Sequence, residues 1–136
     1  MATPREMATL DDAKGVVEGL SFPIEEHRFV GTCFINGEGR DVDILILTLT
    51  DLDDIAYGLK EQGWAASTSE EYPSDSDWFA ARKGLINLLI TADEEFYWAM
   101  SKGADVCKNL VAAGKIAGSD KEARIIIHRT LTGEPL

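Results

Sequence analysis

The chain has 136 residues, of which 24 are acidic and 13 basic, so its formal net charge at pH 7 is −11. This length predicts a single domain, 1–136, with a loose tail over 1–8. A surface this acidic repels phosphate backbones and anionic lipids, which argues against non-specific nucleic-acid binding and against membrane association. The apolar runs are strand-length and far too short to span a membrane.

Two cysteines, Cys33 and Cys107, are too few for a disulfide framework or a metal cluster. We expect them to be small buried apolar residues in a reducing compartment. The first residues also contain no apolar segment typical of a signal peptide. Together these features predict a cytoplasmic protein.

The first predicted elements are a helix and two strands. Apolar residues at helical spacing predict a helix over 9–20, and 26–30 predicts a strand that leads into Gly31-Thr32. After a short element and a turn at 36–39, residues 42–49 are β-branched and leucine-rich almost throughout. Such a run is typical of a strand buried on both faces.

A third strand, a helix and a hairpin are predicted in the middle of the chain. Asp51 and Asp54 are expected to cap the helix, which ends at Gly63. Its inward-facing residues are expected to be Leu52, Ile55, Ala56 and Leu59. Residues 64–69 predict a strand. Two further strands, 78–82 and 85–91, predict a hairpin joined at Lys83-Gly84.

Two helices with capping boxes, 91–94 and 119–122, are expected at the end of the chain. The inward side of the first is predicted to comprise Phe96, Ala99, Met100, Gly103, Cys107, Leu110 and Val111. That of the second is predicted to comprise Ala123, Ile126, Ile127, Thr130 and Leu131. His128 is expected to be a structural histidine. The whole order predicts an α/β (α+β) fold, with helices packed on a mixed sheet of about five strands.

Asp41 and Asp43 lie at the start of the apolar strand 42–49. Residues two apart on a strand point to the same side, so the two carboxylates are expected to project together. Two carboxylates this close repel each other unless one is protonated or a cation bridges them. Oxygen ligands of this kind suit Mg²⁺ or Mn²⁺, which predicts a metal site. The alternative is a solvated acidic strand end.

The residues around this pair carry a family resemblance. Val30, Gly31 and Thr32, eight intervening residues, and then Asp41 and Asp43 alternating with apolar residues resemble the signature of the DNA polymerase β-like nucleotidyltransferase superfamily. The stretches 83–98 and 120–124 are similar to small bacteriophage proteins labelled as nucleotidyltransferases. The resemblance covers most of the chain, although its motifs are short.

The resemblance implies a minimal nucleotidyltransferase fold and in-line attack on the α-phosphate of a nucleoside triphosphate, with pyrophosphate leaving. It implies that Asp41 and Asp43 are catalytic residues and shared ligands of two Mg²⁺ (or Mn²⁺) ions. Phosphate contacts are expected at Gly31 and Thr32. Three basic residues are further candidates for phosphate contacts, namely Arg40, Arg82 and Lys83. For Arg82 and Lys83, ordinary roles in the hairpin are the alternative.

Two positions depart from the family pattern. Thr32 stands where the family has Gly or Ser, and its β-branch crowds the turn. Asn87 stands where the family has a third acid, and an amide can bind a metal ion but cannot act as a base. Asn87 is therefore predicted to be either a metal ligand or a hydrogen-bonded polar residue in an apolar strand. Four acids lie in a polar loop that could fold over the site: Glu70, Glu71, Asp75 and Asp77.

Three functions are compatible with these features. The first is a phage-type nucleotidyltransferase, which would reside in the host cytoplasm. The second is a catalytically degenerate scaffold that binds a basic host protein, with Trp64, Trp78 and Trp98 as interface anchors if they are exposed. The third is a regulatory or antitoxin-like nucleotidyltransferase that works with a protein partner.

Overall fold

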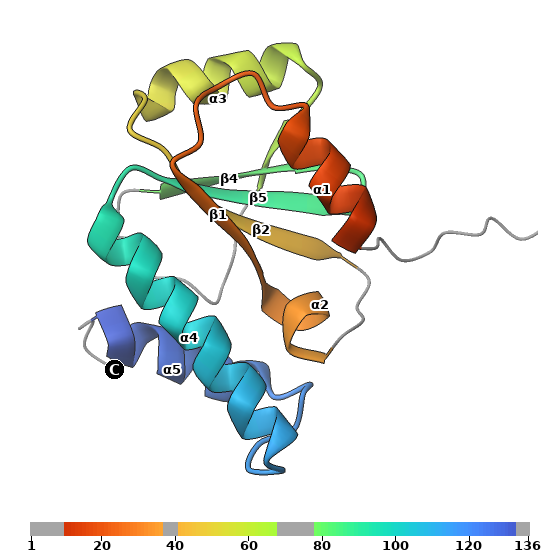
Figure 1. Ribbon diagram of the computed structural model, residues 1–136, viewed down its shortest axis with the longest axis vertical. Helices are drawn as coiled ribbons and strands as arrows, with labels where there is room; N and C mark the ends of the chain where they lie inside the picture. Colours follow the sequence, from red (N-terminus) through yellow and green to blue (C-terminus); the bar gives the residue numbers. More distant parts are fainter. Residues whose placement is uncertain (1–9, 37–40, 68–77, 133–136) are drawn as a thin grey trace, which may run out of the picture.

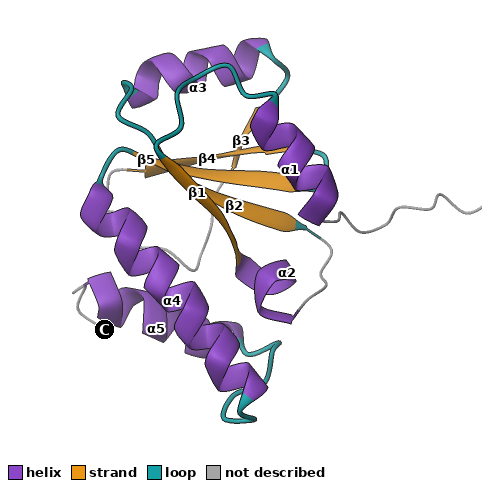
Figure 2. Cartoon of the chain, in the orientation of Figure 1, coloured by secondary structure: helices purple, strands orange, loops and turns teal. Residues whose placement is uncertain are grey.

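The computed structural model describes residues 10–36, 41–67 and 78–132, apart from the side chains of 10–13, 32, 33 and 132. Its elements are α1 (Leu10–Glu18), β1 (Glu26–Val30), α2 (Gly31–Asn36), β2 (Val42–Leu47), α3 (Leu52–Glu61), β3 (Ala65–Ser67), β4 (Trp78–Lys83), β5 (Ile86–Thr91), α4 (Glu94–Ala112) and α5 (Lys121–Thr132). They form an α+β fold with a mixed sheet, which confirms the predicted fold class (Figures 1 and 2).

The five strands of the described residues are ordered β1-β2-β5-β4-β3. The two apolar strands β2 and β5 pair in parallel, and every other neighbouring pair is antiparallel. All six residues of β5 are buried, as are all residues of β2 except Asp43. The strand predicted over 42–49 to be buried on both faces therefore lies inside the sheet, and β5 lies beside it.

Helices cover both faces of the sheet, and each face has its own apolar core. On one face, α1 and α3 pack over a cluster that includes Val42, Ile44 and Ile46. On the other face, α4 and α2 pack over a cluster that includes Leu45 and Leu47, and α5 packs against α4. Since side chains alternate along β2, Asp43 belongs to the second face, the one that carries α2 and α4.

The helix starts differ from the predicted capping boxes. At α4 the N-cap is Asp93, whose Oδ1 accepts a hydrogen bond from the Phe96 N–H at 3.2 Å. Thr91, the expected first residue of that box, is the last residue of β5. At α5 the side chain of Asp120 accepts from the Ala123 N–H at 3.1 Å. In both helices an aspartate one or two residues further along does the capping, because its carboxylate reaches the free N–H groups.

The predicted inward face of α5 is correct only in part, since Ala123, Ile127 and Leu131 are partly buried but Thr130 is exposed. Ile126 is 51% exposed, whereas His128 and Arg124 are buried. Gly103 of α4 makes this possible, because a Cβ there would lie 2.6 Å from the His128 ring. The His128 Nδ1–H donates to the Arg124 carbonyl oxygen at 2.8 Å, which confirms the structural role expected for this histidine.

Further predictions can be compared with the structure. Ala56, expected to face inward, is exposed on α3, and β2 ends at Leu47 so that Leu49 is 72% exposed. Cys107 is buried as predicted. Within the described ranges, no helix combines the length and apolar character needed to cross a membrane. Asn36, the first residue of the turn predicted at 36–39, is the last residue of α2, whereas 37–39 and the end of the strand predicted over 64–69 lie outside the described residues.

Arg28 of β1 ties the sheet to α4 and α2. Its Nη2 donates to Asp105 Oδ1 at 2.7 Å, and its Nη1 donates to Asp105 Oδ2 and to the Ser101 carbonyl oxygen, each at 3.1 Å. The same guanidinium lies 4.8 Å from the centre of the Phe34 ring of α2. These contacts fix β1 against two helices, immediately before the glycine at which α2 begins.

The Arg28–Asp105 pair predicts a defined pH dependence. Hydrogen bonds from Arg28 hold the pKa of the Asp105 carboxyl below its ordinary value of 3.8, against the opposing effect of burial. A lowered pKa stabilises the fold above the unfolded value, and this contribution is lost as the pH falls through the folded value. Asp105→Asn should lower the free energy of unfolding at pH 7 by about 0.5–1 kcal/mol, since Asp105 is largely exposed.

Urea unfolding at pH 7 and at a pH below 3.8 measures this effect. The difference between the wild type and Asp105→Asn should shrink at the lower pH. An Arg28→Gln background serves as the control, because Asp105→Asn should have little effect there at any pH. A difference that is the same at both pH values would contradict the assignment.

Candidate functional site

The predicted site residues meet in one row across the sheet. Val30 of β1 pairs with Asp43 of β2, Asp43 with Asn87 of β5, and Asn87 with Arg82 of β4. Residues that are direct partners in neighbouring strands point to the same face. The row therefore carries Asp43, Asn87 and Arg82 on the face covered by α2 and α4, and Asp41 lies two residues before Asp43.

Gly31 follows the row directly and starts α2. Its φ is +75°, a conformation that residues with a side chain rarely adopt. A Cβ at this position would overlap the carboxylate of Asp43, with its Cγ only 3.0 Å away. The carboxylate thus packs directly on the glycine backbone. The glycine and acid that the sequence motif pairs across twelve positions are in contact in the fold.

Asp41 has a cationic partner. Its Oδ2 lies 3.2 Å from Nη1 of Arg82, and both side chains are about one-third exposed, at 35% and 37%. Arg82 belongs to β4, which is two strands away from β2 in the sheet. Two strand spacings are about 10 Å, so the arginine side chain must cross the face of β5 to reach Asp41. This ion pair offsets part of the repulsion between Asp41 and Asp43.

Asn87 occupies the centre of the row and is only 3% exposed. Its Oδ1 is buried and accepts no hydrogen bond from any residue that the structure describes. A buried acceptor without a donor costs about 1–3 kcal/mol, so few proteins keep one without a role for it. The Oδ1 atom is therefore an acceptor open to a ligand, and both roles of Asn87, metal ligand and hydrogen-bonded polar residue, stay predictions.

The donor set fits one hard cation better than two. Magnesium commonly takes one or two protein carboxylates and completes its shell with water and substrate phosphate. Asp41, Asp43 and the Asn87 Oδ1 can supply such a set. No cluster of three or more His, Cys, Asp or Glu side chains suited to a metal ion occurs within 10–36, 41–67 and 78–132. A second ion held by a third carboxylate therefore has no ligand in this part of the chain.

The other candidate residues lie elsewhere in the fold or outside the described residues. Lys83 points to the opposite face, where its Nζ donates to the Gln62 carbonyl oxygen at 2.9 Å. It therefore acts in the hairpin and not at the acidic pair. Arg40 and the polar loop with Glu70, Glu71, Asp75 and Asp77 lie outside the described residues, and so does the side chain of Thr32.

Sequence reasoning missed the ion pair between Asp41 and Arg82. It placed the hairpin turn at Lys83-Gly84, whereas the strands pair Lys83 with Ile86 and turn at Gly84-Leu85. The correct turn follows from Gly84, whose φ is +61°. This register puts Arg82 opposite Asn87, whereas a turn at Lys83-Gly84 would have put it opposite Leu85.

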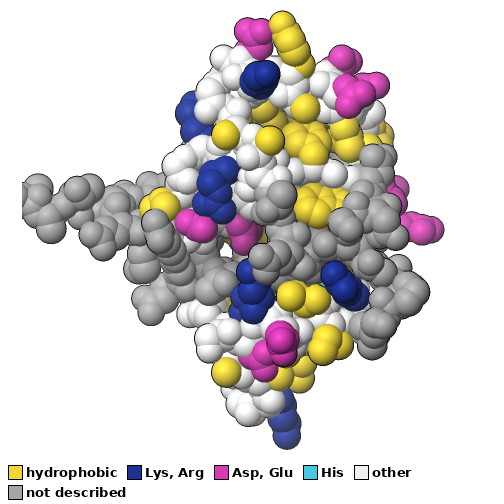
Figure 3. Space-filling model, turned by 180° about the vertical axis from the view of Figure 1, so that it is seen from behind, with side chains coloured by type: hydrophobic (Ala, Val, Ile, Leu, Met, Phe, Trp, Pro, Cys, Tyr) yellow, Lys and Arg dark blue, Asp and Glu magenta, His cyan; other side chains and the backbone are white. Residues whose placement is uncertain are grey.

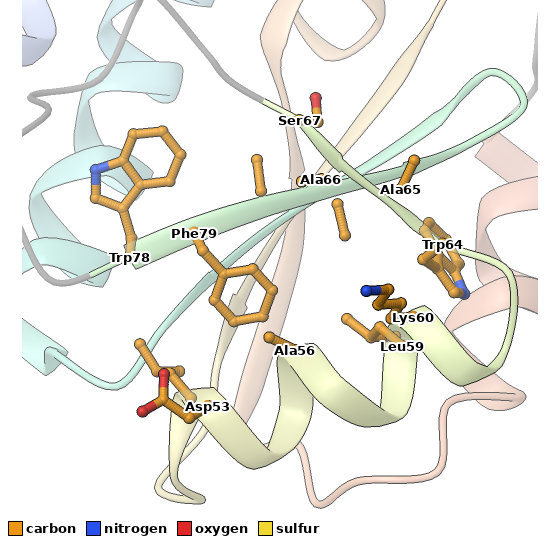
Figure 4. Close-up of a pocket in the computed structure, with 13 residues that line it drawn as sticks. Asp53, Ala56, Leu59, Lys60, Trp64, Ala65, Ala66, Ser67, Trp78 and Phe79 are labelled. Atoms are coloured by element: carbon orange, nitrogen blue, oxygen red, sulfur yellow. The ribbon is translucent and has the colours of Figure 1, made fainter.

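A large cavity lies on the other face of the sheet, away from the acidic pair. It has a volume of about 780 Å³ between α3 and strands β3 and β4 (Figure 4). The Phe79 ring points into it, with Asp53 and Lys60 of α3 along its wall. Ser67 and Trp78, two of its lining residues, adjoin the segment that the structure does not describe. We assign no role to this cavity.

Charged side chains of both signs are interspersed on the face shown in Figure 3. Acidic and basic groups lie side by side near its middle, and apolar side chains gather towards the end that carries α3. The net charge of −11 therefore does not form one continuous acidic surface on this face.

Comparisons with known proteins add one structural likeness. A scan against protein-family models and a search of curated proteins both find no match. Among solved structures, the chain is similar to the conserved protein GrpB from Enterococcus faecalis, with a TM-score of 0.48 and 14% sequence identity. The match covers 91% of this chain and 90% of that chain.

The contact between Gly31 and Asp43 can be tested by substitution. Gly31→Ala should lower the free energy of unfolding through both the positive φ and the overlap with the Asp43 carboxylate. Gly84→Ala is the matched control, because Gly84 has φ +61° with nothing within 4 Å of an added Cβ. We expect about 1–2 kcal/mol for the control and at least about 1 kcal/mol more for Gly31→Ala.

The measurement is urea unfolding of both variants, repeated in an Asp43→Ala background. There the cost of Gly31→Ala should fall towards that of Gly84→Ala, because the colliding carboxylate is gone and only the close approach to the Cβ of residue 43, at 3.2 Å, is left. Equal costs for the two glycines in the wild-type background would contradict the close approach.

Proposed function

We propose that the protein binds a nucleoside triphosphate together with Mg²⁺ or Mn²⁺ at Asp41 and Asp43, and that it is a nucleotidyltransferase. The observation that carries this proposal is the Asn87 Oδ1, a buried acceptor without a described donor beside Asp43 in the row. A pair of acidic residues does not by itself indicate a ligand site, and the buried acceptor is an additional feature that a bound cation would satisfy. The resemblance of the Gly31 and Asp41–Asp43 motif to nucleotidyltransferases supports the same function.

Each residue of the row has a proposed role. Asp41, Asp43 and the Asn87 Oδ1 hold the cation, which neutralises charge on the phosphates when it is bound. Backbone N–H groups at the start of α2 contact phosphate oxygens, since the absence of a side chain at Gly31 permits close approach. The proposed phosphate contacts are Arg82, together with Arg40 and the Thr32 hydroxyl, which lie outside the described part of the structure.

The proposed reaction joins an acceptor oxygen to the α-phosphorus while the bond from that phosphorus to the pyrophosphate oxygen breaks. The acceptor must lose a proton in this step. Asn87 cannot accept it, and the described part of the row offers no further carboxylate for the purpose. We therefore propose that the acceptor's proton passes to solvent. The proposed function is accordingly tested by nucleotide binding.

Binding of a protein partner remains a prediction. The degenerate scaffold would use the tryptophans as anchors if they are exposed, and Trp64 is buried while Trp78 is half-buried and stacks on Phe96 at 6.2 Å. Trp98 alone of the three is exposed, at 50%. No arrangement among the described residues favours a basic protein partner over a nucleotide.

Calorimetry with a non-hydrolysable nucleoside triphosphate and Mn²⁺ tests the proposal. Asp41→Asn/Asp43→Asn should weaken binding at least tenfold, because it removes two charges from the proposed ligands while keeping their shape. Asp53→Asn/Asp54→Asn makes the same charge change at exposed positions on α3 and should bind as the wild type does. Absence of binding to the wild type, or equal binding by both variants, would overturn the proposed function.

Asn87→Leu separates a ligand from a structural residue in the same assay. Removal of a buried acceptor that has no donor should leave the free energy of unfolding unchanged or raise it. The same change should weaken binding of the Mn²⁺–nucleotide complex by about threefold to tenfold, the loss of one neutral oxygen ligand. Reduced stability with unchanged binding would show that Asn87 is structural.

A further inference from the structure

Arg82 is paired with a carboxylate that a bound cation would also use. Its Nη1 lies 3.2 Å from the Asp41 carboxylate, one of the proposed metal ligands. The guanidinium reaches this place by crossing β5 above the row position of Asn87. A divalent cation bound to Asp41 and to the Asn87 Oδ1 would face the same carboxylate. The arginine and the cation therefore compete for Asp41.

The contacts of Arg82 are those of an exchangeable partner. It makes one ion pair among the described residues, at 3.2 Å, and more than one-third of its side chain is exposed. Pairs of this kind contribute little stability, because solvent screens them and the long side chain loses freedom. The protein can hold an arginine much more firmly. Arg28 has two contacts to Asp105, a bond to a backbone carbonyl and an aromatic ring beneath it.

We propose that Arg82 is an exchangeable counter-ion of the site, which pairs with Asp41 when no divalent cation is present and turns to the polyphosphate when the cation binds. This inference rests on the proposed function and adds a coupling between its two ligands. The cation releases Arg82 from Asp41, and the freed guanidinium suits phosphate oxygens, for which its planar fork is the preferred partner.

Coupling of this kind is reciprocal. A cation that releases Arg82 for the phosphates must raise their affinity, and the phosphates must raise the affinity for the cation by the same factor. Arg82 thereby weakens binding of the cation alone and strengthens binding of the cation with a polyanion. The site then takes up the metal–polyphosphate complex in preference to either component, which limits occupation by free metal.

The test measures Mn²⁺ binding by calorimetry, with and without inorganic tripolyphosphate as the probe, for the wild type and Arg82→Gln. Arg82→Gln should bind Mn²⁺ alone about twofold to fivefold more tightly, because the competing ion pair is gone. With Mn²⁺ present, the same variant should bind tripolyphosphate about tenfold more weakly, because one charge-assisted contact is lost. The two effects have opposite signs, which a general loss of folding cannot produce.

Lys83→Gln is the matched control. It removes one positive charge from the next residue of the same strand, but Lys83 points to the opposite face and bonds to Gln62. Both affinities should remain those of the wild type. Arg82→Lys keeps the charge without the planar fork, and it should retain part of the coupling between the two ligands.

The outcomes distinguish this inference from the proposed function. If Mn²⁺ binds to the wild type and binding requires Asp41 and Asp43, but Arg82→Gln changes neither affinity, the counter-ion role is wrong and the proposed function stands. If Arg82→Gln weakens both affinities, Arg82 is a simple supporting contact and the exchange is wrong. If the wild type binds no Mn²⁺ at all, the proposed function and this inference fail together.

Discussion

The parallel pairing of β2 with β5 is the constraint on which the site depends. It places Asp43 beside Asn87, and the antiparallel partners on either side add Val30 and Arg82 to the same row. Side chains alternate along a strand, so a slip of one residue in any pairing would move that member to the other face. Both faces of β2 and β5 are buried in apolar cores, which makes such a slip very costly. The cores therefore hold the polar row in place.

The row contains two polar features that apolar packing does not require, a partly solvated ion pair and a buried amide oxygen. Asp41 and Asp43 carry like charges, and Arg82 offsets one of them through a weak, partly solvated pair. Asn87 keeps a buried oxygen without a described donor. Neither arrangement improves stability, whereas the firmly held Arg28 shows that this chain can satisfy an arginine fully. The buried Asn87 oxygen and the weakly paired Asp41 belong to the same part of the sheet, and this is the physical basis for proposing a cation and a polyphosphate there.

Much of this arrangement was predictable, and the failures have physical causes. The apolar run of 42–49 marked β2 as an inner strand, and the alternation of Asp41 and Asp43 with apolar residues predicted that both project to one side. Apolar spacing predicted the inward face of α5 only in part, because the space left by Gly103 accommodates His128 while Ile126 is exposed. The ion pair of Asp41 with Arg82 joins residues forty-one positions apart across two strands, and it depends on a turn displaced by one residue. Local patterns carry no information about such a contact.

Diffraction from crystals grown with Mn²⁺ and a non-hydrolysable nucleoside triphosphate tests the central claim most directly, because manganese can be located by its anomalous scattering. We expect one manganese peak about 2.0–2.3 Å from carboxylate oxygens of Asp41 and Asp43 and from the Asn87 Oδ1. We also expect the Arg82 guanidinium to have left Asp41 for the phosphates. Manganese and nucleotide bound elsewhere, with the pair of Asp41 and Arg82 intact, would contradict the account.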